Sequence, residues 1–228
     1  MPDDVAKDRA GYRLVNTNPN RVRVTHSSTQ NLPDNTLTRV KFDTERYDGN
    51  SQHSTSTLVI TGTLTTVSGS TALTGVGTAF TTELSVGQAI NFPGSVSETR
   101  VVTGVTNNTA ATVNRAWTNS TSSIGAAHVN SALVCTTEGT YDIWATIGFG
   151  SSTAGKREVY LRLNDTAYIG AAIVAPVSGD MTIVNVATDY DLSLWDFVEV
   201  VARQNTGSTL DVTHTTGQSP VFGWHRIG

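Results

Sequence analysis

The stretch GTYDIWATIGF, residues 139–149, decides the fold class. It is rich in aromatic and β-branched residues, and no helical period runs through it. Seven more runs of this kind lie between residues 128 and 228: SALVCTT, REVYLRLND, AYIGAAIV, MTIVNVATDYDL, DFVEVVARQN, LDVTHT and VFGWHRI. They recur about every 10–13 residues and are separated by glycine-containing turns. This pattern predicts an all-β sandwich or jelly roll.

The chain upstream divides into three further segments. Residues 21–56 continue the β pattern, with Val22 and Val24 alternating with polar residues. Residues 57–127 contain few charged side chains, and Thr, Ser, Gly and Val form about five or six short strands there, which predicts a small β barrel or sandwich. Residues 1–20 are polar and show no sustained period, so we expect an extended N-terminal arm.

Composition excludes several classes of function. The 228 residues carry a net charge of −4, a poor match for a polyphosphate, so we expect no nucleic-acid partner. No run is apolar enough to span a bilayer, and the N-terminal residues lack the apolar core of a signal peptide, so we expect a soluble protein made in a cytoplasm. The single Cys135 excludes an intrachain disulfide and is expected to be a small buried hydrophobe rather than a reactive thiol.

Short motifs on both sides of residues 57–127 resemble the complement-one-q/tumour-necrosis-factor-like jelly roll, in the version common among bacteriophage structural proteins. They cover about 130–140 residues in two pieces, and they depart from the family where Trp195 replaces the Gly of a Gly-Asp turn. The matching elements are Phe42–Asp43, Tyr47–Asp48, Gly139–Tyr141–Ile143, Leu192–Val200, Gln204–Asn205–Gly207 and Phe222–Trp224.

The resemblance implies one jelly roll made of residues 21–56 and 128–228, interrupted by residues 57–127. The interrupting segment, hereafter the insert, is similar to a small β module found in phage tail and fibre proteins. Insertion into a loop whose ends are close costs little chain entropy. The family also implies a homotrimer, in which sheets pack around a threefold axis.

The sequence shows no motif of a catalytic, cofactor or metal site. His26, His53, His128, His214 and His225 have no metal-binding spacing, and His53 and His128, which flank the insert, are expected to be surface residues. The acidic pairs Asp189/Asp191 and Asp196/Glu199 are expected to face solvent, although a glycosidase pair stays open. Calcium bound by loop carboxylates, for example at Asp43, Asp48 or Asp189, also stays open.

Aromatic residues supply the binding candidates. Those at alternate strand positions are expected in the core or in a trimer seam: Tyr141, Trp144, Tyr160, Phe222 and Trp224. Trp117, at the end of the insert, is expected to pack in the core, and stacking on a sugar is the alternative for which it is the best candidate.

We therefore expect a non-enzymatic bacteriophage virion protein, a trimeric decoration, head-fibre or spike component at the virion surface. Its expected partners are its own copies and other capsid or tail proteins, without nucleic acid or membrane insertion, and it would be made in the bacterial cytoplasm. A tail-tip or fibre adhesin that recognises host surface glycan is the first alternative. A lectin unrelated to virions and a polysaccharide-cleaving enzyme are the others.

Overall fold

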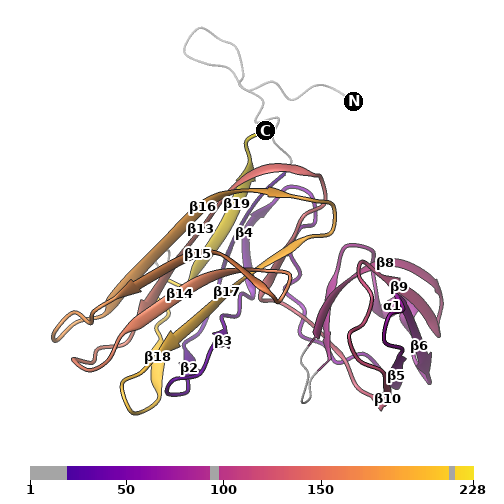
Figure 1. Cartoon of the computed structure of the whole chain (residues 1–228), viewed down its shortest axis with the longest axis horizontal. Helices are drawn as coiled ribbons and strands as arrows, with labels where there is room; N and C mark the ends of the chain where they lie inside the picture. The colour runs from indigo at the N-terminus through magenta and orange to yellow at the C-terminus, as the bar shows by residue number, and fades with distance from the viewer. Residues whose placement is uncertain (1–19, 93–97, 216–218) are drawn as a thin grey trace, which may run out of the picture.

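The computed structural model describes residues 20–92, 98–215 and 219–228, and almost all regular structure in them is β (Figure 1). The expected all-β jelly roll is confirmed. The expected N-terminal arm lies outside the described residues, apart from Asn20. None of the described residues forms a helix with the length and apolar character needed to cross a membrane.

The first sheet of the jelly roll is built around β13, which pairs with the equally long β16 along one side and with β19 along the other. The order β16-β13-β19-β1-β4 results, and β18 and β2 extend the sheet from the end of β13. The strands are β1 (Arg21–Thr25), β2 (Gln30–Leu32), β4 (Thr44–Asp48), β13 (Gly139–Phe149), β16 (Thr182–Leu192), β18 (Leu210–Val212) and β19 (Val221–Arg226).

The second sheet has the order β12-β17-β14-β15, and β3 pairs with β17 beside β12. Its strands are β3 (Thr38–Arg39), β12 (Ala132–Val134), β14 (Arg157–Leu163), β15 (Ala167–Val174) and β17 (Phe197–Gln204). On both faces of β17, nearly every residue is buried. One face of β17 points into the jelly-roll core, and the other is covered by the insert at Phe197 and by the Arg39 side chain at Glu199.

Alternation along the strands builds the core between the two sheets. In β13 the inward residues are Tyr141, Ile143, Ala145, Ile147 and Phe149, all fully or almost fully buried. Each large apolar side chain removed from water stabilises the fold by about 1.5–3 kcal/mol. This burial fixes the register, because a slip of one residue would turn the whole set outward.

The insert forms a separate seven-stranded sheet with the order β10-β5-β6-β9-β8-β7-β11. Its two outermost strands follow one another in sequence, so the sheet curls back on itself around its own core. A four-residue helix, α1 (Phe80–Glu83), was not expected from the strand pattern. The strands are β5 (Thr63–Thr66), β6 (Ala72–Val76), β7 (Ala89–Phe92), β8 (Glu98–Asn107), β9 (Ala110–Val113), β10 (Thr121–Ile124) and β11 (Ala127–His128).

The chain enters and leaves the insert through two adjacent segments. The His128 N–H donates to the Leu58 carbonyl at 3.1 Å, and the Ile60 N–H donates to the Ala126 carbonyl at 2.9 Å. Val59 and Ala127 form an antiparallel bridge between these bonds. The insert therefore stands beside the sandwich, next to β17 and β3, with its ends paired (Figure 1).

Candidate functional site

Four charged side chains meet where the insert joins the jelly roll, and we call them the junction cluster: Arg39, Arg162, Asp165 and Glu199. The Arg39 guanidinium lies 2.6 Å from Asp165 Oδ1 and 2.9 Å from Glu199 Oε1. Arg162 lies 2.7 Å from Glu199 Oε2 and 3.3 Å from Asp165 Oδ1. Two cations and two carboxylates cancel, so the cluster can be buried without a net charge.

Glu199 is the deepest member of the cluster, with a side chain that is 0% exposed. Burial raises its pKa, while the charges of Arg39 and Arg162 act in the opposite direction. Burial would lower the pKa of Arg39, but Glu199 and Asp165 outweigh it and raise that pKa above its ordinary value. The Ser131 hydroxyl also donates to Glu199, at 3.1 Å.

The junction cluster reaches across to the insert through hydrogen bonds. The backbone N–H of Thr99 donates to Asp165 Oδ2 at 2.6 Å, and Arg39 donates to the Thr99 hydroxyl at 2.9 Å. Nearby, Arg115 of the insert donates to the Asn164 carbonyl at 3.0 Å. These bonds hold the insert in one orientation on the jelly roll.

An apolar contact lies beside these polar bonds. Ala89 and Val101 of the insert share a buried cluster with Val134 and Phe197 of the jelly roll. Trp195 packs against this cluster with a backbone φ of 68°, the left-handed conformation that glycine adopts most easily. The Asn114 side chain donates a hydrogen bond to the Trp195 carbonyl at 2.9 Å. Trp195 thus places its indole against the insert, next to Gly87.

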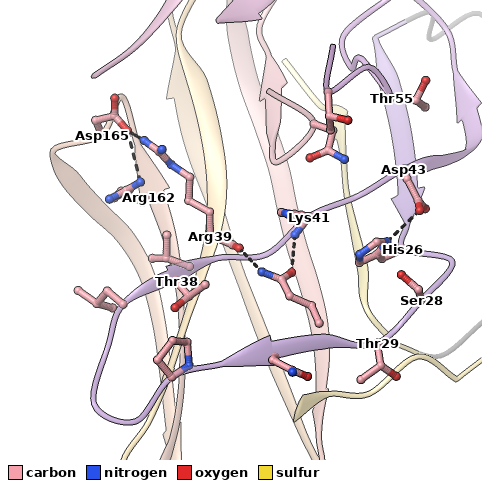
Figure 2. A pocket seen from close by; sticks show the side chains of 17 residues that line it. His26, Ser28, Thr29, Thr38, Arg39, Lys41, Asp43, Thr55, Arg162 and Asp165 are labelled. Atoms are coloured by element: carbon pink, nitrogen blue, oxygen red, sulfur yellow. Dashed lines mark hydrogen bonds and ion pairs between the residues drawn. The ribbon is translucent and has the colours of Figure 1, made fainter. Parts of the chain in front are cut away.

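A polar groove with a cavity volume of about 1100 Å³ lies next to the junction cluster. Its walls come from the loop after β1, from β2 and β3, from the segment before β4, and from residues 55 and 57 on the way into the insert (Figure 2). The Gln30 amide braces one wall, since it donates to the Arg39 carbonyl at 2.8 Å and accepts from the Lys41 N–H at 3.0 Å.

Asp43 lies at the other end of this groove (Figure 2). Its carboxylate lies 3.0 Å from His26 Nδ1 and accepts from the Ser27 N–H at 2.8 Å and the Ser27 hydroxyl at 2.6 Å. Burial would raise its pKa, but the hydrogen bonds from Ser27 and Thr44 and the charge of His26 lower it to about 2. A glycosidase acid needs a raised pKa, so Asp43 is suited to accept hydrogen bonds rather than to donate a proton.

The structure divides the aromatic candidates into core and surface. Tyr141, Phe222 and Trp224 are 0–1% exposed and belong to the jelly-roll core, not to a seam. Trp144 is half-buried on the outer face of the first sheet, with the Arg23 guanidinium 5.7 Å from its ring. Tyr160 is half-buried on β14, where its hydroxyl donates to Glu158 at 2.7 Å.

The sugar-stacking role considered for Trp117 is wrong. Its side chain is 2% exposed, packs edge-on against Phe92 at 4.7 Å between ring centroids, and donates from Nε1 to the Ala72 carbonyl at 3.0 Å. It belongs to the core of the insert, where a strand-end Trp covers the apolar residues of a small curled sheet.

The histidine and calcium candidates also receive structural roles. His53 and His128 are buried rather than at the surface, and His53 lies 3.0 Å from Glu45 and donates to the Asn130 carbonyl at 3.1 Å. Asp48 caps its loop by accepting the N–H groups of Asn50, Gln52 and His53, as Asp43 does for Ser27. Asp189 is exposed on β16, and the described part of the chain contains no group of three or more metal-ligating side chains.

The junction cluster was missed by sequence reasoning, which placed Glu199 among solvent-facing carboxylates. Glu199 alternates with Val198 and Val200 in β17, and in an isolated jelly roll it would face water. The insert and the Arg39 side chain cover that face instead. The signal was present as three charged residues in two strand-like runs, Arg162, Asp165 and Glu199, but nothing in the pattern paired them with Arg39.

Comparisons with known proteins give matches among solved structures. There 106 chains match, including the crystal structure of murine APRIL at pH 5.0. That chain is 13% identical, with a TM-score of 0.34, and the match covers 61% of this chain and 99% of that chain. No protein-family model and no curated protein matches the sequence. The function of this all-β jelly roll therefore has to be argued from its own surfaces.

Proposed function

We propose that this chain is a non-enzymatic bacteriophage virion protein. In this proposal it assembles as a homotrimer and carries its insert at the particle surface as a decoration, head-fibre or spike component, attached to capsid or tail proteins by its N-terminal arm. The phage assignment rests on the sequence resemblance, and the assembly rests on the shape of one sheet face.

The outer face of the first sheet is the observation that carries the proposed trimer. Apart from Trp144 and Ile183, its strands β13 and β16 carry small or polar side chains, and a Cβ added at Gly223 would lie 2.8 Å from the Trp144 ring, so the indole packs directly over β19. Beside it, the Thr146 hydroxyl donates to Asn185 at 2.7 Å, and Asp142 lies 3.5 Å from His225. A face of mostly small and polar side chains around a half-buried Trp suits close packing of sheets around an axis.

The fixed insert supports a display role. The junction cluster and the apolar contact around Phe197 hold the insert in one orientation, so three copies would present three identical surfaces. A fixed orientation suits a protein that binds a ligand or supports neighbouring proteins at a fixed place on a particle.

Two other readings remain as alternatives to the decoration role. An adhesin that recognises host surface polysaccharide is favoured by the polar groove beside the junction cluster. Cleavage of that polysaccharide fits less well, since the low pKa of Asp43 keeps its carboxylate ionised. We therefore propose binding rather than catalysis.

Light scattering on the purified chain tests the assembly, and a mass of three chains is expected. Trp144→Glu should shift the population to monomers, because a desolvated charge would enter the seam. Val76→Glu, on an exposed position of the insert, is the matched control and should remain trimeric. A wild-type monomer, or a Trp144→Glu variant that is still trimeric, would contradict the proposed seam, and a reconstruction of the phage particle would test the virion location.

A further inference from the structure

The polar groove has no role in the proposed trimer, which uses the outer face of the first sheet. The groove opens instead beside β2, β3 and the segment that leads into the insert (Figure 2). Its volume of about 1100 Å³ is at the upper end of what small-molecule sites use, about 300–1000 Å³, so it has room for an extended ligand.

The lining offers hydrogen-bonding groups that the protein does not use itself. Within the described residues, five uncharged polar side chains that line the groove make no hydrogen bond: Ser28, Asn31, Thr55, Thr57 and Asn130. Each can donate to and accept from a ligand. A ligand covered with hydroxyl groups matches this lining.

One lining cation also lacks a charged partner among the described residues. The Lys41 side chain is exposed and takes part in no ion pair there, whereas Arg39 and Arg162 are balanced by Asp165 and Glu199. The two carboxylates that line the groove, Asp43 and Asp165, are already occupied by protein donors. The groove therefore offers a single ammonium to a ligand carboxylate.

Other extended ligands fit less well. Among the residues that the structure describes, no Phe, Tyr or Trp lines the groove, so the bases of a single-stranded nucleic acid would have no described ring to stack on. The apolar side chains in this described lining are Pro33, Leu37 and Val201, too few for the hydrophobic face of a bound helix.

We propose that this groove binds an acidic oligosaccharide. A sugar carboxylate pairs with the Lys41 ammonium, and sugar hydroxyls exchange hydrogen bonds with Asn31, Thr55 and Thr57. This site is separate from the proposed seam, so it does not depend on the trimer or on the virion assignment.

Calorimetric titration of the full-length chain with hexagalacturonate tests the proposal, with maltohexaose as the neutral counterpart. Hexagalacturonate should bind saturably and more weakly as salt is raised, and maltohexaose should bind less tightly. Lys41→Ala should weaken hexagalacturonate binding by up to about fivefold, the range of a solvent-accessible ion pair. Thr57→Trp, which places an indole in the groove, should abolish it.

Lys156→Ala is the matched control, because Lys156 is an exposed lysine that does not line the groove. Its affinity for hexagalacturonate should equal that of the wild type. The proposal is overturned by absence of saturable hexagalacturonate binding, by equal affinity for maltohexaose, or by unchanged binding in folded Lys41→Ala or Thr57→Trp protein. Light scattering on the same samples reports the oligomeric state separately.

Discussion

The carboxylate of Asp165 accepts a hydrogen bond from the backbone N–H of Thr99 at 2.6 Å, so one side chain of the jelly roll is bound directly to the main chain of the insert. Its other oxygen lies 2.6 Å from the Arg39 guanidinium. Asp165 therefore balances charge within the jelly roll and fixes the insert at the same time. Loss of this carboxylate should affect both parts of the molecule.

Asp165→Ala should lower the free energy of unfolding by about 3 kcal/mol, because it removes one of the two carboxylates that lie beside Arg39 and Arg162 in a largely buried place. Chemical denaturation measures the loss. Asp180→Ala, at an exposed turn, should change stability by less than about 0.5 kcal/mol. Equal stability of the two variants would show that the junction cluster contributes little.

Trp195→Gly should uncouple the insert from the jelly roll. Glycine relieves the cost of a positive φ, about 1–3 kcal/mol, but it removes the indole from the cluster that contains Phe197. Differential scanning calorimetry of this variant should show two separate unfolding transitions. In the wild type the unfolding of the insert and of the jelly roll should be more strongly coupled, so the two transitions should lie closer together. Leu194→Gly, next to it and exposed, is the control and should leave the coupling unchanged.

The low pKa of Asp43, about 2, predicts the pH range in which acid destabilises the fold. A carboxyl with a depressed pKa in the folded state stabilises the protein above its unfolded pKa of about 4, and this contribution is lost as pH falls toward 2. Asp43→Asn should therefore be less stable than the wild type by about 1 kcal/mol at pH 6, since the side chain is partly exposed. In urea titrations the difference should narrow below pH 4, and a difference that does not change with pH would contradict this assignment.

Cys135 should be inert in the folded protein. Its side chain is 0% exposed, and burial raises the pKa of its thiol, so little thiolate forms at neutral pH. A chromogenic disulfide reagent should label no thiol in native protein and one thiol in guanidinium. Rapid labelling of native protein would show that the surrounding strands open readily.

The sequence predicted the parts of the fold that depend on local alternation. The inward positions of GTYDIWATIGF follow from a period of two, and the burial of Cys135 follows from its place in the strand-like run SALVCTT, directly after β12. Trp195 was recognisable as an exception, because a bulky residue stands where a turn favours glycine. In each case a few neighbouring residues carry the information.

The junction cluster and the groove depend on contacts between distant segments. Arg39 and Asp165 are separated by 126 positions, and their contact requires β3 to pair with the edge of β17. Trp117 shows a related limit: the end of a strand is exposed or buried according to how the sheet curls, so a sugar contact stayed open beside the favoured core packing. Local propensity does not contain this information.

The paired ends of the insert have a further consequence. Because Leu58 and His128 are hydrogen-bonded neighbours, the jelly roll meets the insert as it would meet a short hairpin turn. A different domain could be grafted between these positions, provided that its own termini lie one strand spacing apart, about 4.8 Å. The inserted domain could then be exchanged while the strand register of the jelly roll stays the same.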